Sequence, residues 1–372
     1  MEKREQIRRC LELVVDRMKN LRNEIVIEKY PIGLIDIDLW EWPQGVGLYG
    51  LYQYYQATGD EKTLGFLIDW FEDRIREGLP ERNVNTTSPL LTLIALAELT
   101  GREDFDAVCR DWGRWIMNGL IRTGDNAFQH MITGDPNDGQ ILIDTLFMTV
   151  LFLAKAGVRY RKPAYIEEAK RQFLVHIKYL FEKKTGLFYH GWNSKERHNY
   201  GAVYWGMGNG WFTSGVIDFL DAVTVEHGLK TYLLDTLNSQ VETLSRLQSP
   251  EGMWHTILDD PSSYVESSAT AAFGYGILKA IRLGYLDRKY AAASWKAVDA
   301  IMRNIAADGT VGNVSYGTPV GNDSQLYKDI EVRPMTYGQA LAILLLVEAA
   351  KHYEEPDAAA ARRRDNVRQI IA

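Results

Sequence analysis

A loose internal repeat of helical hairpins constrains the fold of this chain more than any other feature of its sequence. Each unit begins with an apolar segment rich in small residues, passes through a turn that contains glycine, and ends with a segment whose apolar residues recur at helical spacing. Repeats that cannot bury a face alone must stack on their neighbours. Five units are visible, and a sixth begins at Met335: residues 47–75, 88–117, 144–181, 210–247 and 267–302.

The two segments of each unit differ in their polarity. The first is apolar on nearly all sides, as in LLTLIALAEL, whereas the second is apolar on one side, as in IDWFEDRI. The first segment therefore belongs inside and the second outside, with its apolar stripe turned inward. A glycine near the middle of each unit is expected to end the inner helix in a left-handed conformation. These glycines are Gly59, Gly101, Gly157, Gly228 and Gly284.

Six inner and six outer helices, with residues 5–20 as one outer member, predict an all-α fold. The pattern favours an (α/α)6 toroid, a six-hairpin barrel, as a single domain over residues 1–372. An open helical solenoid is the alternative arrangement of such repeats. Loops of varied length, rich in Gly, Trp and His, favour the toroid, in which long loops line one mouth.

Charge and apolar patterning exclude two classes of partner. The chain carries 42 Lys and Arg against 49 Asp and Glu, and no basic stripe, which predicts no nucleic-acid partner. No apolar run reaches the length of a membrane span, and no signal peptide is visible, so no membrane partner is expected. Two cysteines, Cys10 and Cys109, indicate a reducing compartment and a cytoplasmic protein. The sequence carries no signal for an oligomeric state.

The loops before the predicted inner helices contain the polar and aromatic residues that are candidates for chemistry. Because these loops meet at one mouth, their side chains are expected to converge there. Aromatic faces in such a site commonly stack on sugar rings. Histidines and cysteines lack metal-ligand spacing, and no glycine-rich phosphate loop follows a strand, so neither a metal nor a cofactor is predicted. The candidates are Trp42, Asn85, His130, Asp144, His190, the segment from Trp205 to Trp211, and Glu266. Asn85, which precedes two threonines and a serine, is also typical of a capping and turn segment.

Asp144 stands in the apolar stretch GQILIDTLFMTVLF and has two interpretations. It either caps the N-terminus of the following helix, or it is a buried carboxyl group with a raised pKa that can deliver a proton. The residues support both equally. Glu266, which precedes Ser267, favours the capping role. Glycosidases ordinarily use two carboxyl groups, so a mechanism that needs only one acid fits this chain more easily.

At this point the sequence resembles the unsaturated rhamnogalacturonyl hydrolases of glycoside hydrolase family 105, which are similar to the unsaturated glucuronyl hydrolases of family 88. The resemblance covers nearly the whole chain. It depends on six ordered blocks, which are WEWPQGVGLYGLYQYYQATGD (40–60), NVNTTSPLLTL (83–93), ILIDTLFM (141–148), KTGLFYHGWN (184–193), YWGMGNGW (204–211) and YVESSATAAFGYGILKAIRLGYLD (264–287).

The resemblance implies the (α/α)6 fold and a small oligosaccharide substrate that ends in a 4,5-unsaturated galacturonic or glucuronic acid. It implies hydration of a vinyl ether, in which Asp144 protonates C4 and then helps a water add at C5. Asn85 matches a second polar position of the family, which holds the uronate or orients the acid. Trp42, His130, His190 and Trp211 match positions that contact the sugar.

One position departs from the family pattern. Met207 stands where the family often has Arg in a Trp-Ala-Arg-Gly-Asn-Gly-Trp loop. Loss of a bidentate donor there is expected to change which sugar or aglycone is accepted. Arg333 or Lys328, in the last loop, is a candidate to compensate.

Two other functions remain open from the residues. Another toroid sugar enzyme, an inverting glycosidase or an epimerase, needs a second carboxylate facing Asp144 or an acid–base pair of His130 and His190. A non-catalytic sugar-binding toroid is the other alternative, and Met207 is the feature that favours it. The candidates for a second carboxylate are Glu266, Asp36 and Asp38.

Overall fold

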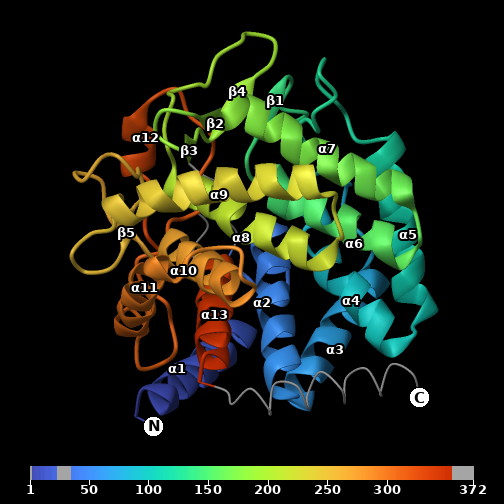
Figure 1. Cartoon of the computed structure of the whole chain (residues 1–372). Helices are drawn as coiled ribbons and strands as arrows, with labels where there is room; N and C mark the ends of the chain where they lie inside the picture. The colour runs from blue at the N-terminus through green and yellow to red at the C-terminus, as the bar shows by residue number, and fades with distance from the viewer. Residues whose placement is uncertain (1, 23–34, 354–372) are drawn as a thin grey trace.

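The computed structural model describes residues 2–22 and 35–353 of the 372-residue chain. These residues are mostly helical, and their strands form three two-stranded antiparallel pairs. Figure 1 shows long helices packed against one another, with strands β1 to β4 and the loops around them at the top of the view. The predicted all-α class is confirmed. None of the helices in the described ranges is long and apolar enough to cross a bilayer.

Six helices are buried along most of their length, as expected for the first segment of each hairpin. In α8 and α13 nearly every residue is buried, because their sequences are apolar or small on all faces. Each of the six contacts the next in chain order, and the last contacts the first. They are α2 (Trp42–Thr58), α4 (Leu90–Thr100), α6 (Leu151–Arg159), α8 (Gly206–Ala222), α10 (Ser267–Arg282) and α13 (Thr336–Lys351).

Six amphipathic helices pack on these buried ones through a single stripe. In α3, for example, the buried stripe consists of Leu67, Trp70 and Phe71 together with Thr63. Each pairs with the buried helix before it in the chain, except that the first helix packs against α13. They are α1 (Glu2–Lys19), α3 (Glu61–Glu77), α5 (Glu103–Asn118), α7 (Pro163–Leu180), α9 (His227–Leu247) and α11 (Ala291–Arg303).

Three of the five glycines predicted to end inner helices have the expected left-handed backbone. Gly59 and Gly101 directly follow α2 and α4, with φ values of 72° and 67°. Gly284 lies two residues beyond α10 and has a φ of 74°. Because a side chain is disfavoured at such angles, glycine fits these turns.

The prediction was wrong for Gly157 and Gly228. Gly157 lies inside α6, where a Cβ atom would come within 2.6 Å of Ile166 on α7, so this glycine permits close packing of the two helices. The left-handed residue after α6 is instead Arg161, with a φ of 51°. Gly228 is the second residue of α9, and the turn before it ends at Glu226, the residue that precedes the helix.

Short elements fill the connections between the helices, and β1 to β4 lie near the top of Figure 1. Strand β1 (Gln140–Leu142) pairs with β4 (Gly191–Asn193), with Leu142 opposite Gly191. The remaining elements are β2 (Phe181–Glu182) paired with β3 (Leu187–Phe188), β5 (Trp254–His255) paired with β6 (Val265–Glu266), the 3-10 turns η1 (Asn85–Thr87) and η3 (Arg288–Tyr290), the π-helical segment η2 (Leu146–Val150), and α12 (Ser324–Lys328).

Candidate active site

The pairing of β1 with β4 brings Asp144 and His190 together although they are distant in the chain. Asp144 follows β1 by two residues, and His190 immediately precedes β4. A backbone hydrogen bond from the Ile143 N–H to the His190 carbonyl, at 3.1 Å, extends the pairing to these residues. The His190 Nε2 atom lies 3.5 Å from Oδ2 of Asp144. The strand register therefore sets this contact.

Asp144 is not a helix cap. The first turn of η2 receives no side-chain hydrogen bond, and the N-terminal flanking residue of that segment is Thr145. Oδ2 of Asp144 is buried and, apart from the 3.5 Å approach of His190, has no polar partner among the described residues. The side chain as a whole keeps 16% of its surface exposed. A short π-helical segment directly after the acid is a common feature of functional sites.

The prediction of a raised pKa for Asp144 was wrong, because neighbouring imidazole groups lower that pKa. Burial alone raises the pKa of this carboxyl group, because it disfavours the charged form. The imidazole of His190, and secondarily that of His130, favours the carboxylate and outweighs burial, so the pKa is held below its ordinary value. With nothing bound, Asp144 is therefore a carboxylate at neutral pH.

His130 and Asn85 approach the acid from two other segments. His130 Nδ1 lies 2.9 Å from Oγ1 of Thr145, and burial lowers the pKa of His130 to about 4, so the ring is neutral at neutral pH. Asn85 begins η1, which a hydrogen bond from the Val84 N–H to the Met131 carbonyl attaches to the His130 segment. Both side chains present neutral polar groups to the space around Asp144.

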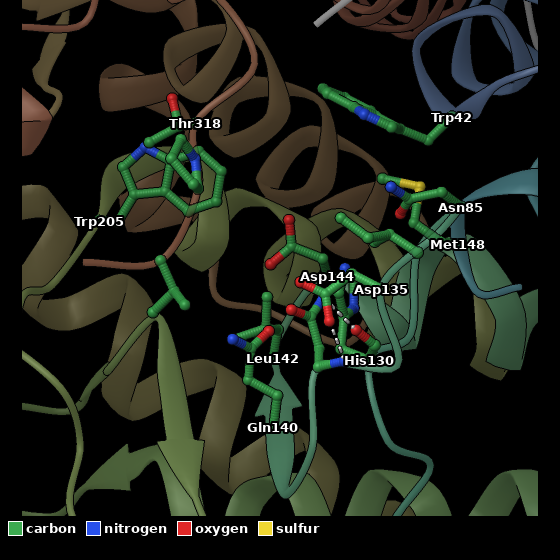
Figure 2. A pocket seen from close by; sticks show the side chains of 14 residues that line it. Trp42, Asn85, His130, Asp135, Gln140, Leu142, Asp144, Met148, Trp205 and Thr318 are labelled. Carbon is green, nitrogen blue, oxygen red and sulfur yellow. Dashed lines mark hydrogen bonds between the residues drawn. The ribbon is translucent and has the colours of Figure 1, made fainter. Parts of the chain in front are cut away.

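These side chains line a cavity of about 260 Å³. Figure 2 shows the Asp144 carboxyl group directed into it, with the Trp205 indole on one side and Trp42 on the other. The lining contains no Lys or Arg, within the part of the chain that the structure describes. It consists of Trp42, Asn85, His130, Ile132, Asp135, Asn137, Gln140, Leu142, Asp144, Met148, Trp205, Thr318, Pro319 and Val320.

Trp205, the first residue of the candidate segment 205–211, lines the cavity. Its ring lies 4.2 Å from the His190 ring, its side chain is 3% exposed, and its indole N–H has no hydrogen-bond partner among the described residues. A buried indole N–H normally has a partner, so the unpartnered group of this cavity-lining residue is a candidate contact for a ligand oxygen. The sequence analysis had assigned the sugar contact of this segment to Trp211 and not to Trp205.

Trp211, a predicted sugar contact, and Met207, which replaces the family Arg, both lie in the core. Trp211 is fully buried, with its ring 6.4 Å from Trp42 and 4.9 Å from Phe147, and it does not line the cavity. Met207 is 1% exposed, and its methyl group packs near Gly210. Both side chains of α8 point toward neighbouring helices. In this geometry neither one is placed to contact a sugar in the cavity.

The sequence analysis named several charged residues as candidate compensating cations or second carboxylates. None of them lines the cavity. Glu266 caps α10, because it accepts hydrogen bonds from the backbone N–H groups of Ser268 and Ala269, so its capping role is confirmed. The ion pairs of the others are Arg333 with Glu331, Lys328 with Asp260, and Arg22 with both Asp36 and Asp38. Among residues 2–22 and 35–353, no three His, Cys, Asp or Glu side chains form a metal-ligand group.

Asp135 is a second carboxylate in the lining. It is exposed, and its Oδ1 accepts a hydrogen bond of 2.8 Å from the backbone N–H of Asn137, which stabilises the turn after His130. An exposed carboxylate occupied by a turn differs in chemistry from the buried Asp144. The cavity therefore holds one buried acid.

The sequence and the fold of this chain match those of known proteins. The family model described as Glycosyl Hydrolase Family 88 matches residues 14–353. The chain belongs to glycosyl hydrolase family 88. It is 32% identical over 315 residues to the unsaturated rhamnogalacturonyl hydrolase YesR of Bacillus subtilis (strain 168), covering 84% of this chain and 90% of that protein. The family resemblance inferred from the six sequence blocks is confirmed.

Solved structures agree with this membership. A possible member of the GH105 family from Salmonella enterica is 40% identical, with a TM-score of 0.91, and the match covers 94% of this chain and 95% of the other. A possible GH105 member from Klebsiella pneumoniae is also 40% identical, with a TM-score of 0.89 and 94% of each chain covered. This family 88 chain is a glycoside hydrolase.

Proposed function

We propose that this family 88 hydrolase removes a 4,5-unsaturated galacturonic or glucuronic acid from the non-reducing end of oligosaccharides that a polysaccharide lyase has produced. The observation that carries the proposal is Asp144, the one buried carboxyl group that the described residues place in the cavity, beside two indole rings and the neutral side chains of Asn85 and His130. The names of its relatives, an unsaturated rhamnogalacturonyl hydrolase and an unsaturated 3S-rhamnoglycuronyl hydrolase of Alteromonas sp. (strain LOR), support this reaction class.

Hydration of a vinyl ether needs only one acid group. Asp144 donates its proton to C4 of the double bond, and the positive charge that develops at C5 is shared with the ring oxygen. A water then adds at C5 while the Asp144 carboxylate accepts its proton, which restores the acid. The hemiketal opens at the ring oxygen and leaves a hemiacetal at C1, and this releases the aglycone.

The substrate itself supplies the protonation state that this step requires. Its carboxylate brings a negative charge into a cavity whose lining, among the described residues, has no Lys or Arg, and its ring displaces water around Asp144. A nearby like charge and desolvation both raise the pKa of a carboxyl group. The lowered pKa of Asp144 in the empty site therefore rises on binding, and the acid is protonated where the double bond is held.

The same absence of cations favours an aglycone without a sulfate group. A sulfated sugar adjacent to the uronide would place another anion beside Asp135 and Asp144, and the described part of the chain supplies no guanidinium or ammonium group in the lining to pair with it. The proposal therefore places unsulfated disaccharides ahead of sulfated ones as substrates.

We also propose that the fold is an (α/α)6 toroid that forms one domain. The contacts from α2 through α13 and back to α2, with an amphipathic helix on each, support a closed ring of hairpins. The loops and strand pairs that carry Asp144, His190 and Trp205 then surround one mouth of the ring.

The test is loss of the ultraviolet absorbance of the conjugated enol acid when the enzyme meets lyase products of rhamnogalacturonan, ulvan and glycosaminoglycans. We expect the absorbance to fall fastest with the unsulfated rhamnogalacturonan product. Saturated disaccharides of the same sugars serve as the control and should not be cleaved. Turnover of a saturated substrate at a comparable rate would support a classical glycosidase instead, and binding without turnover would support a sugar-binding protein.

A further inference from the structure

The hydroxyl group of Tyr327 lies behind His190, on the side of the imidazole opposite Asp144. Tyr327 belongs to α12 and is 1% exposed. Its oxygen lies 2.8 Å from Nδ1 of His190 and accepts a hydrogen bond of 3.2 Å from the backbone N–H of Gly321. The chain thus forms a row of polar groups that runs from Gly321 through Tyr327 and His190 to Asp144.

The hydrogen positions along this row follow from donor and acceptor counting. The Gly321 amide can only donate, so it uses one lone pair of the Tyr327 oxygen. A buried hydroxyl hydrogen needs an acceptor, and His190 Nδ1 is the one within hydrogen-bond distance among the described residues. Burial raises the pKa of Tyr327 well above its usual value, so the hydroxyl keeps its hydrogen. Nδ1 of His190 is then an acceptor and carries no proton.

We propose that Tyr327 is a positioning residue that holds His190 in the tautomer with its proton on Nε2, so that an N–H group is directed at Oδ2 of Asp144. The Trp205 ring, 4.2 Å from the imidazole, covers one side of His190. The tautomer of a histidine is set by the partner of its other nitrogen, and Tyr327 is that partner here.

This inference rests on the proposed function in one respect, the consequence for the reaction. With Nε2–H facing Oδ2, the protonated form of Asp144 carries its hydrogen on Oδ1 and cannot pass it to the imidazole. The opposite tautomer would present a lone pair to Asp144 and draw the acid's hydrogen toward His190, away from C4 of the substrate. Tyr327 therefore keeps the proton of Asp144 available for transfer.

The tautomer can be measured without turnover by NMR of protein labelled with ¹⁵N-histidine. An ionised Asp144 would itself favour Nε2–H, so the spectra are compared in an Asp144→Asn background, where the neutral amide imposes no such bias. We expect Asp144→Asn alone to show a pyrrole-like Nε2 and a pyridine-like Nδ1 for His190. Adding Tyr327→Phe should mix the two tautomers. The His190 signals are assigned by their loss in His190→Gln.

Tyr264→Phe is the matched control. The hydroxyl group of Tyr264 forms a hydrogen bond of 2.9 Å with Oγ of Ser315 and not with His190. Added to Asp144→Asn, it should leave the tautomer unchanged. A His190 protonated on Nδ1 in Asp144→Asn, or the same tautomer with and without Tyr327→Phe, would overturn the proposal.

Kinetics of variants that retain Asp144 test the consequence for the reaction. Tyr327→Phe should lower kcat roughly tenfold, the order of one lost hydrogen bond, with KM nearly unchanged, whereas Tyr264→Phe should keep the wild-type kcat. An equal loss in both variants, or an unchanged kcat in Tyr327→Phe, contradicts the positioning role. If the wild-type enzyme turned over no unsaturated substrate, the proposed function would fail, while the NMR result would still decide the tautomer.

Discussion

Nε2 of His190 lies 3.5 Å from Oδ2 of Asp144, and this contact decides the ionisation of the buried acid. The two residues stand at the ends of the paired strands β1 and β4, so their separation is set by backbone hydrogen bonds and not by a mobile loop. A carboxylate held ready in this way must gain its proton when the substrate binds.

Asp144→Asn should reduce kcat/KM at least about 100-fold, and up to about 10,000-fold, because an amide cannot donate and recover the proton. The fold should be retained, since Asn has nearly the same shape and its cavity is open to water. The absorbance assay and circular dichroism measure the two effects. Asp135→Asn, the same change in an exposed carboxylate of the same cavity, is the control and should keep most of kcat. Comparable losses in both variants would contradict the assignment of Asp144.

The pH dependence should differ between the free enzyme and its complex. Asp144 must be protonated to act, so activity falls as the pH rises through its pKa. That pKa is lowered in the empty site, and bound substrate raises it. The alkaline limb of kcat should therefore lie at higher pH than that of kcat/KM. His130, with a pKa of about 4, is already neutral there and adds no limb near neutral pH. A kcat limb at the same or lower pH would show that substrate does not raise the pKa.

Trp205→Phe should raise KM roughly tenfold with a smaller effect on kcat, because Trp205 lines the cavity and the change removes an indole N–H that has no protein partner in the described residues. Trp211→Phe is the matched substitution, since its indole N–H is likewise without a partner but lies in the core. It should lower the free energy of unfolding by about 1–3 kcal/mol and leave KM within about twofold. The opposite pattern of KM values would place Trp211, and not Trp205, against the sugar.

Glu41, which precedes α2 and accepts a hydrogen bond from the Trp42 N–H, should make stability depend on pH. Burial raises its pKa to about 7 from an ordinary value of 4.5. Between these values the unfolded chain has lost the proton and the folded chain keeps it, so the free energy of unfolding falls as the pH rises, by at most about 3 kcal/mol. Glu41→Gln should remove this fall, as measured by urea denaturation near pH 5 and near pH 8.

Asp60, the N-cap of α3, is a control because its pKa is shifted in the opposite direction from that of Glu41. A hydrogen bond from the Thr63 side chain, with one from its backbone N–H, lowers the pKa of Asp60, so its contribution is present above the unfolded-state pKa and is lost in acid. Asp60→Asn should therefore reduce stability at neutral pH and have little effect at low pH. If Glu41→Gln showed this same pattern, burial would not be raising the pKa of Glu41.

Local patterns predicted the helices well and the turns less well. The apolar and one-sided segments became buried and outer helices because periodicity reports directly on burial. Gly157 shows the limit of such reasoning. A glycine in a turn and a glycine at a helix crossing look alike in a sequence, and only the position of Ile166 on the neighbouring helix distinguishes them. The predicted cytoplasmic location and the predicted extent of the domain stay predictions.

The sequence by itself determined the helical class, the family, and the identity of Asp144, Asn85 and His130 as neighbours in one site, since these follow from patterns and blocks along the chain. Only the tertiary structure decided how Asp144 is ionised and which tryptophan faces the cavity. The ionisation depends on a 3.5 Å contact with His190. Trp205 precedes α8 with an extended backbone, whereas Trp211 lies within the helix and packs in the core. Both the ionisation of Asp144 and the tryptophan that faces the cavity depend on contacts between segments that are far apart in the sequence, and no local pattern encodes such contacts.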